Sequence, residues 1–291
     1  MILVTGANGH LGGAIVEHLS RRTAPARILA ASRDPGSLAP PKGGAVRHAD
    51  FADPTSLPDA FAGVERIELV SVDKLGEEAR RLHRHAIAVA SGAGVERIFY
   101  TSHAGAREGS PFPPADQHAA SEADLAASGT PFTALRHGFY AESCLQMIGE
   151  DLKAGELRAP EDGPVCWTAR DDLAQADAAL LAGEATFDGA TPPLTASRAW
   201  SMAEIAEIAS QMTGREVRHT VVSDAEWKAA KIAAGVPEHY AEMLLGTFRA
   251  ARRGDFSVVD PTLENLLSRK PTPLREVLAA ALAPAPQTNR K

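Results

Sequence analysis

Cysteine is scarce in this sequence, since Cys144 and Cys166 are the only two in 291 residues. Two cysteines are too few for a disulfide framework, and no C-x-x-C pair or His/Cys cluster has the spacing of a structural zinc site. We therefore expect no bound metal and a reducing compartment, the cytoplasm.

An excess of positive charge is also absent. The chain carries 30 Lys and Arg against 37 Asp and Glu, a formal net charge of −7, which argues against a nucleic-acid-binding surface. No apolar run approaches the roughly 18 residues that a membrane span requires, and no secretory leader pattern opens the chain. The expected partner is a small molecule rather than nucleic acid or a membrane.

Short apolar runs alternate with segments of helical length and amphipathic pattern. This alternation is typical of parallel strands that are buried on both faces and joined by helical crossovers. Strands are predicted at 2–6, 27–33, 45–50, 66–72, 97–102 and 132–138. Helices are predicted at 11–22, 55–62, 76–93 and 117–127. The fold class is therefore α/β, with a doubly wound parallel sheet of the Rossmann type.

The pattern changes in the second half of the chain. We expect a dinucleotide-binding Rossmann domain over 1–160, to which about 164–185 returns as a strand end and a helix. A smaller α/β lobe that binds substrate is expected over 186–285, where the helical stretch "SMAEIAEIASQMTG" precedes the strand-like "EVRHTVV". Residues 286–291 are predicted to be a flexible tail.

The segment "TGANGHLGG" follows the first predicted strand and opens the first helix. Its Gly6, Gly9 and Gly12 form G-x-x-G-x-x-G, which is either a dinucleotide-binding loop or a plain strand-to-helix turn. In the first reading, Gly6 makes the tight turn, Gly9 lets the backbone approach a pyrophosphate, and Gly12 lets the helix pack closely on the sheet. Cofactor binding is the favoured interpretation. Asn8, His10 and Leu11 belong to the same loop and are predicted to bind the cofactor with it.

The end of the second strand bears on the choice between the two nicotinamide cofactors. Strands that select NAD usually end in an acidic residue, whereas this strand ends "AASRD" and offers Arg33, whose guanidinium suits a 2′-phosphate. NADP(H) is therefore predicted over NAD(H). The alternative is that Arg33 is a solvated loop residue and that Asp34 holds an unphosphorylated ribose. Asp50, after the third strand, either caps a turn or contacts the adenine.

Several segments together carry a family likeness. These segments are "TGANGHLGGAIVEHL", "ASRDP", "HADFADPTSLPDAFAGVERIELVS", "ASGAGVERIFYTS", "HAASEADLAASGTPFTALRHGFYAES" and "CWTARDDLAQADAALL". In this order they resemble the NmrA-like branch of the atypical short-chain dehydrogenase/reductases, and most closely its bacterial NAD(P)H:quinone oxidoreductases. The resemblance implies hydride transfer from NADP(H) directly to a quinone-like substrate, without flavin.

The resemblance also implies site residues. It places Ser71, Val72, Thr101 and Ser102 beside the nicotinamide and its ribose, and Phe139 and Tyr140 at the substrate cleft between the lobes. His103, directly after the fifth strand, either lines this cleft or caps the loop that follows it.

The chain departs from ordinary short-chain reductases in one respect. None of its three tyrosines is followed four places later by lysine, so the Tyr-x-x-x-Lys proton donor is missing. His118-x-x-x-Glu122 stands near the expected location, on one face of a predicted helix. Glu122 either orients the His118 imidazole or forms a solvated pair with it. Our hypothesis is that His118 and Ser102 stabilise the oxyanion that develops on the acceptor.

Two functional classes fit these observations. The first is an NADPH-dependent reductase of quinones or similar electron-poor acceptors, such as an azo dye or an activated alkene. The second is a non-catalytic NADP(H)-binding redox sensor of the NmrA type, with which the missing tyrosine and lysine are compatible. An open apolar cleft beside the nicotinamide would favour the enzyme. The oligomeric state stays open, with a homodimer as one alternative.

Overall fold

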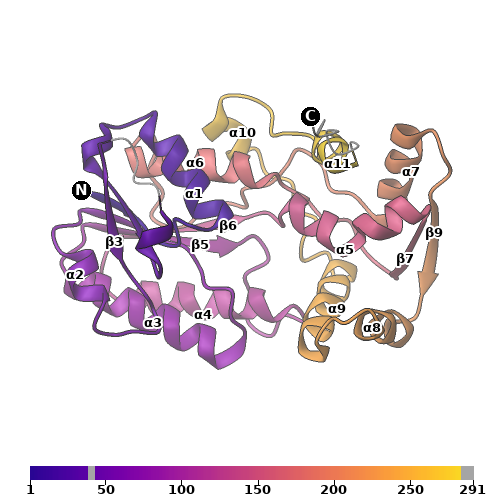
Figure 1. Ribbon diagram of the computed structural model, residues 1–291, viewed down its shortest axis with the longest axis horizontal. Coiled ribbons are helices and arrows are strands. Elements are labelled where there is room, and N and C mark those ends of the chain that lie inside the picture. The colour runs from indigo at the N-terminus through magenta and orange to yellow at the C-terminus, as the bar shows by residue number, and fades with distance from the viewer. Residues whose placement is uncertain (39–42, 283–291) are drawn as a thin grey trace, which may run out of the picture.

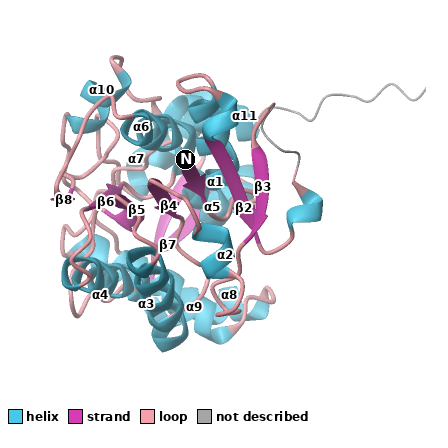
Figure 2. Cartoon of the chain, turned by 90° about the vertical axis from the view of Figure 1, so that its left-hand side faces the viewer, coloured by secondary structure: helices cyan, strands magenta, loops and turns pink. Residues whose placement is uncertain are grey.

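The computed structural model describes residues 1–38 and 43–282, and the predicted tail at 286–291 lies outside them. Within the described residues, seven parallel strands form one sheet in the order β3-β2-β1-β4-β5-β6-β8, seen nearly end-on in Figure 2. The order reverses between β1 and β4, as in a doubly wound sheet, where ligands bind beyond the carboxyl ends of the strands. The α/β fold class predicted from the sequence is confirmed.

The strands are β1 (Ile2–Val4), β2 (Ile28–Ser32), β3 (Ala45–His48), β4 (Arg66–Leu69), β5 (Arg97–His103), β6 (Phe132–His137), β7 (Glu156–Pro160), β8 (Gly189–Ala190) and β9 (Arg218–Val222). The helices are α1 (His10–Ser20), α2 (Leu57–Phe61), α3 (Gly76–Gly92), α4 (Pro113–Ala127), α5 (Ala141–Ala154), α6 (Arg170–Ala182), α7 (Met202–Thr213), α8 (Asp224–Ala233), α9 (Glu238–Arg252), α10 (Thr262–Leu267) and α11 (Leu274–Leu282). Every strand and helix predicted in the first 138 residues is present, with its ends shifted by a few residues.

Helices cover both faces of the large sheet. α1 and α6 lie on one face and α3 and α4 on the other, as Figure 2 shows. The side chains of the inner strands β1, β2, β4, β5 and β6 are mostly buried, because these strands pack against helices on both sides. The edge strands β3 and β8 are partly exposed. None of the described helices is long and apolar enough to cross a membrane.

A second, two-stranded sheet pairs β7 with β9 in parallel and lies at the far end of the molecule, with α5, α7 and α8 around it (Figure 1). β7 falls inside the 1–160 range expected for the first domain, whereas β8, beyond residue 186, extends the large sheet beside β6. The chain thus crosses between the two sheets more than once, and the exact domain division stays a prediction.

One acidic side chain lies in the middle of the large sheet. Glu68 of β4 is fully buried, and neither of its carboxylate oxygens has a hydrogen-bond partner in the described part of the chain. Burial raises the pKa of Glu68 well above its ordinary value of 4.5, and the nearby Asp177 carboxylate raises it further. The folded protein therefore binds this proton more tightly than the unfolded chain does, so stability falls as pH rises above about 4.5.

We predict that Glu68→Gln reduces this loss of stability with pH, because the amide cannot ionise. Each pKa unit by which the folded and unfolded states differ contributes about 1.4 kcal/mol to the loss. Urea unfolding at pH 6 and pH 8 measures it as the change in the free energy of unfolding between the two pH values. Glu96→Gln, at an exposed position after α3, is the matched control and should keep the wild-type pH dependence. Equal pH dependence in Glu68→Gln and wild type would contradict the prediction.

Candidate functional site

The glycine turn after β1 has the geometry that a dinucleotide-binding loop needs. Gly6 has a φ of +60°, which favours glycine, and the N–H of Gly9 donates to the Gly6 carbonyl at 2.9 Å. A Cβ on Gly12 would lie 2.4 Å from the same carbonyl oxygen, so only glycine lets α1 approach the strand this closely. These are the roles predicted for Gly6 and Gly12.

The N-terminus of α1 is available to an anion. The helix begins directly after Gly9, and the backbone N–H groups of His10, Leu11 and Gly12 have no backbone acceptor among residues 1–38 and 43–282. Unpaired N–H groups at a helix N-terminus, together with the helix dipole, favour a phosphate.

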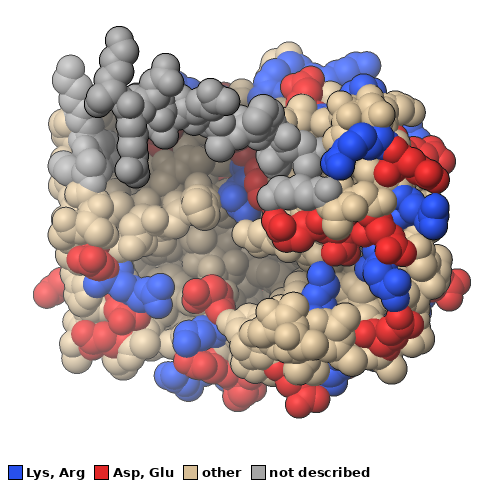
Figure 3. Space-filling model, turned by 45° about the vertical axis from the view of Figure 1, so that its right-hand side comes forward, with Lys and Arg blue, Asp and Glu red and all other residues tan. Residues whose placement is uncertain are grey.

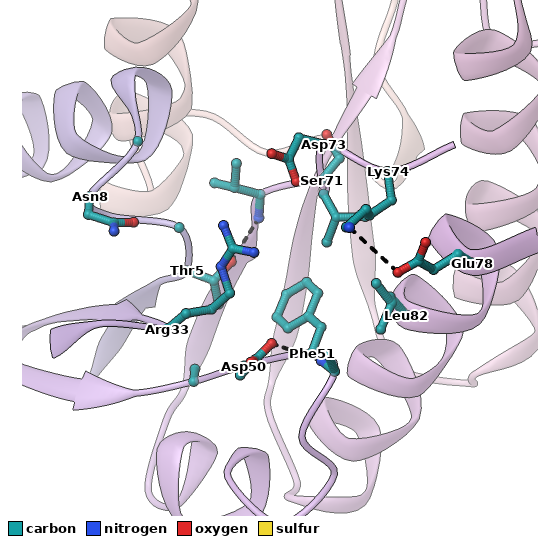
Figure 4. Close-up of a pocket in the computed structure, with 16 residues that line it drawn as sticks. Thr5, Asn8, Arg33, Asp50, Phe51, Ser71, Asp73, Lys74, Glu78 and Leu82 are labelled. Atoms are coloured by element: carbon teal, nitrogen blue, oxygen red, sulfur yellow. Dashed lines mark hydrogen bonds and ion pairs between the residues drawn. The ribbon is translucent and has the colours of Figure 1, made fainter. Parts of the chain in front are cut away.

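A cavity of about 400 Å³ lies beside this turn (Figure 4). Segments at the carboxyl ends of β1 to β4 supply most of its wall, as expected for a doubly wound sheet. The lining residues are Thr5, Gly6, Asn8, Gly9, Arg33, Ala49, Asp50, Phe51, Ala52, Val70, Ser71, Val72, Asp73, Lys74, Glu78 and Leu82. We call this space the cofactor pocket.

Two cationic side chains line the cofactor pocket. Arg33 is exposed and its guanidinium points into the pocket in Figure 4, without a hydrogen bond or ion pair to any described residue. Lys74 lies on the opposite wall, 3.7 Å from the Glu78 carboxylate. Asp50 caps a turn by accepting from the Ala52 N–H at 2.9 Å, which is the first of its two alternatives, and it also lines the pocket. Its contact with the adenine stays a prediction. The free guanidinium is the group best suited to a phosphate monoester.

The segment 70–74, which follows β4, is held by hydrogen bonds to the side chains of four residues. The Thr5 hydroxyl accepts from the Val70 N–H at 2.9 Å, and the Thr101 hydroxyl accepts from the Ser71 N–H at 2.8 Å. The Val72 N–H donates to His83 Nε2 of α3 at 3.0 Å. Gln117 of α4 donates to the Lys74 carbonyl at 3.2 Å. Thr101 is buried and does not line the pocket; it positions Ser71, which does.

A second cavity of about 200 Å³ adjoins the first, since Ser71 lines both. Its residues come from the ends of β5 and β6, from the start of α4 and from the start of α5. They are Ser71, Ser102, His103, Phe112, Pro114, His118, His137, Gly138, Phe139, Tyr140 and Ser143. We call this space the acceptor pocket, and it contains the predicted cleft residues His103, Phe139 and Tyr140.

One wall of the acceptor pocket is aromatic. The rings of His103, Phe112 and Phe139 line it, and Phe256 packs against all three from outside the pocket, with centroids 5.2 to 5.8 Å apart. Phe139 also meets Trp167 edge-on at 5.1 Å. His103 both lines the pocket and holds the following loop, because its Nδ1 accepts from the Gly105 N–H at 3.0 Å. Burial lowers the pKa of His103 to about 3, so this ring is neutral and behaves as part of the aromatic wall.

His118 supplies a polar edge to the acceptor pocket. Its Nδ1 lies 2.9 Å from the hydroxyl of Tyr100, a buried residue of β5. Its Nε2 has no hydrogen-bond partner among the described residues, and the ring lines the pocket. Burial and the neighbouring rings of His103, His83 and His137 lower the pKa of His118 well below 6.5, so the imidazole is neutral.

The predicted pairing of His118 with Glu122 is wrong. Glu122 instead binds the Arg136 guanidinium in bidentate fashion, at 2.7 and 3.0 Å, and accepts from the Ser102 hydroxyl at 2.6 Å. A fork-shaped guanidinium satisfies a carboxylate better than one imidazole nitrogen does, and Arg136 of β6 faces this part of α4. Since the only proton on the Ser102 hydroxyl is directed to Glu122, Ser102 as an oxyanion donor requires that bond to break, and its role stays a prediction.

The two pockets bring together most of the predicted site residues. His10, Leu11 and Gly12 lie in the first turn of α1 rather than on a cavity wall. Sequence reasoning missed Lys74, although its place just after a parallel strand was a usable signal. It also missed Tyr100 and Arg136, whose positions inside strands gave no sign of a functional contact. In the described part of the chain, no group of three or more His, Cys, Asp or Glu side chains could hold a metal ion.

Charge on the molecular surface is mixed. On the face in Figure 3, Lys, Arg, Asp and Glu alternate around a central hollow whose floor is formed mostly of uncharged residues. Interspersed charges of both signs suit a small ligand better than a polyanion.

We predict that Gly12→Ala destabilises the fold and weakens cofactor binding, because the new Cβ would overlap the Gly6 carbonyl. Overpacking of this kind costs about 1–3 kcal/mol. Gly149→Ala is the matched control: it also lies inside a helix, but a Cβ there meets no atom within 4 Å, so it should stabilise the protein by about 0.5–1 kcal/mol. Urea unfolding of both variants measures the difference, and equal effects would contradict our account of Gly12.

Comparison with known proteins agrees with this geometry. A model of the NmrA-like family matches residues 1–278. Quinone oxidoreductase 2 of Escherichia coli (strain K12) is 35% identical over 282 residues, which cover 95% of this chain and 96% of that protein. The crystal structure of the E. coli NADPH-dependent quinone oxidoreductase QOR2 complexed with NADPH has a TM-score of 0.90 at 33% identity, covering 97% of this chain and 100% of that one. The Citrobacter sp. triphenylmethane reductase complexed with NADP(H) has a TM-score of 0.89 at 33% identity, with the same coverage. The chain therefore belongs to the NmrA-like family, as its sequence motifs predict.

Proposed function

We propose that this protein is an NADPH-dependent reductase that reduces a quinone or a similar electron-poor acceptor by direct hydride transfer. The observation that carries the proposal is the pair of adjoining pockets that share Ser71. The first contains the glycine turn, the helix N-terminus and a free guanidinium, which together fit a dinucleotide that carries an additional phosphate. The second is a compact apolar space with one polar edge. The names of the relatives as quinone oxidoreductase and triphenylmethane reductase support an oxidoreductase.

Different residues of the cofactor pocket are expected to bind different parts of the dinucleotide. The N–H groups at the start of α1 would bind the pyrophosphate, and Arg33 would hold the 2′-phosphate of the adenosine. Ser71 and Val72 stand at the junction with the acceptor pocket, where the nicotinamide is expected. The structures of both neighbours contain NADPH or NADP(H), which supports a preference for NADP(H) over NAD(H).

When it is bound, NADPH supplies a hydride to the acceptor, whose ring gains two electrons and whose oxygen becomes an anion. The chain's task is to orient the acceptor against the aromatic wall, exclude water and stabilise that anion. His118 lines this pocket together with the hydroxyl side chains of Tyr140 and Ser143, and we assign the donor role to its Nε2. One proton from solvent then completes the hydroquinone.

The missing Tyr-x-x-x-Lys pair is compatible with this chemistry. A ketone becomes a strongly basic alkoxide on hydride addition and needs a proton in the same step, whereas a hydroquinone anion is far less basic. A cavity of about 200 Å³ is smaller than the ~300–1,000 Å³ typical of drug-sized ligand sites, so a compact acceptor is expected. An apolar pocket beside the cofactor pocket favours the enzyme over the non-catalytic sensor.

We predict that Arg33→Ala weakens NADPH binding by about 10- to 100-fold, because a hydrogen-bonded charged group contributes about 1.5–3 kcal/mol. NADH lacks the 2′-phosphate, so its affinity should change little. Titration calorimetry with both cofactors measures the two effects. Arg21→Ala, at an exposed arginine just after α1, is the matched control. Equal losses for NADPH and NADH would remove Arg33 from this role.

We predict that the purified protein oxidises NADPH when a small benzoquinone or naphthoquinone is present, and that NADH is a poorer donor. His118→Ala should lower kcat by about 10- to 100-fold, because an oxyanion donor is lost. His239→Ala, an exposed histidine of α9, is the control and should leave the rate unchanged. Tight NADPH binding without turnover of any acceptor would overturn the reductase in favour of a redox sensor.

A further inference from the structure

A main-chain donor fixes the protonation of His83. The Val72 N–H donates to His83 Nε2 at 3.0 Å, so this nitrogen carries a lone pair and no proton. His83 is almost fully buried on α3, and burial lowers its pKa to about 4, which keeps the ring neutral. A neutral imidazole has one proton, and in His83 this proton is therefore on Nδ1.

The protonated Nδ1 of His83 faces two hydroxyls. It lies 3.0 Å from Ser121 Oγ and 3.2 Å from the Tyr100 hydroxyl. Ser121 directs its own proton to the Gln117 carbonyl at 3.1 Å, so its oxygen is free to accept from His83. Tyr100 cannot donate to a nitrogen that already carries a proton.

Two other groups adjoin the Tyr100 hydroxyl, Ser121 and His118. Ser121 Oγ already accepts from His83, whereas His118 Nδ1 has no other hydrogen-bond partner among the described residues. The two atoms, Tyr100 Oη and His118 Nδ1, are 2.9 Å apart. Burial raises the pKa of Tyr100 far above 10, so the hydroxyl keeps its proton and donates it in this hydrogen bond. His118 Nδ1 is then an acceptor, and its single proton must be on Nε2.

We infer that Tyr100 and His83 are positioning residues that hold His118 as the tautomer with its proton on Nε2, aimed at the acceptor. The inference rests on the proposed function for its catalytic meaning, but the tautomer itself is a property of the protein. The series of hydrogen bonds that sets these proton positions begins at the Val72 N–H in the cofactor pocket. It passes through His83 and Tyr100 and ends at His118 in the acceptor pocket.

This arrangement determines whether His118 transfers a proton to the acceptor or only donates a hydrogen bond to it. Transfer of the Nε2 proton would require Tyr100 to pass its own proton to Nδ1, which leaves a buried tyrosinate. The raised pKa of Tyr100 opposes that step, and Glu122 and the rings of His103 and His137 supply no positive charge to offset it. His118 therefore donates a hydrogen bond to the anion, and the proton that completes the hydroquinone comes from water. Acceptors that present a lone pair, such as a quinone oxygen or an azo nitrogen, suit this donor better than a cationic dye does.

The first test reads the tautomers directly. In protein labelled with ¹⁵N-histidine, long-range ¹H–¹⁵N spectra distinguish protonated from unprotonated ring nitrogens, with His118→Ala and His83→Ala spectra used to assign the signals. We expect His118 to be protonated on Nε2 and His83 on Nδ1 at pH 7 to 8. A proton on His118 Nδ1 would overturn the inference.

The second test removes the hydroxyl that links the two rings. Tyr100→Phe should let the His118 proton exchange between both nitrogens, and it should lower kcat by about 5- to 10-fold with little change in the Kd for NADPH. Tyr240→Phe, an exposed tyrosine on α9, is the matched control and should change neither quantity. Unchanged His118 signals and unchanged kcat in Tyr100→Phe would overturn the inference.

The two proposals fail in different ways. Absence of quinone turnover in the wild type, with His118 protonated on Nε2, would overturn the proposed function and support the positioning. Full turnover with His118 protonated on Nδ1 would overturn the positioning and support the reductase.

Discussion

The segment 70–74 is the structural constraint on which both pockets depend. Parallel strands end at a common edge of the sheet, so whatever follows β4 is placed beside the turn after β1. The side chains of Thr5, Thr101, His83 and Gln117 form hydrogen bonds with the main chain of this segment, and they come from four different elements or their ends. One side of the segment forms the wall of the cofactor pocket. Its other contacts lead through α3 and α4 to the acceptor pocket.

The fold and the cofactor pocket were largely predictable from the sequence, because their signals are local. A glycine motif between an apolar strand and an amphipathic helix specifies a turn, and Gly6 and Gly12 have the backbone geometry that the motif predicts. Arg33 follows its strand directly. The position of a loop residue after a parallel strand is set by the sheet alone, without knowledge of distant contacts.

The acceptor pocket was less predictable, because its contacts join residues far apart in the chain. Spacing on a helix places His118 and Glu122 on one face but does not show that Arg136, fourteen residues after Glu122, offers the carboxylate a better partner. Tyr100 meets His83 and His118 only because α3 and α4 pack side by side on the face of the sheet toward which this side chain of β5 points (Figure 2). The strand β7 pairs with β9, about sixty residues later, and no local pattern marks that partner.

The proton position on His118 is set, through His83 and Tyr100, by the backbone N–H of Val72. This has a consequence for protein engineering. The Val72 N–H is present whatever side chain stands at that position, proline excepted, so random mutation rarely removes it. The aromatic wall, by contrast, consists of the separate side chains of Phe112 and Phe139, with Phe256 packed behind them, and a single codon change can alter each of these rings. Libraries that vary these three rings can therefore explore new acceptors while the polar edge of the pocket keeps its chemistry.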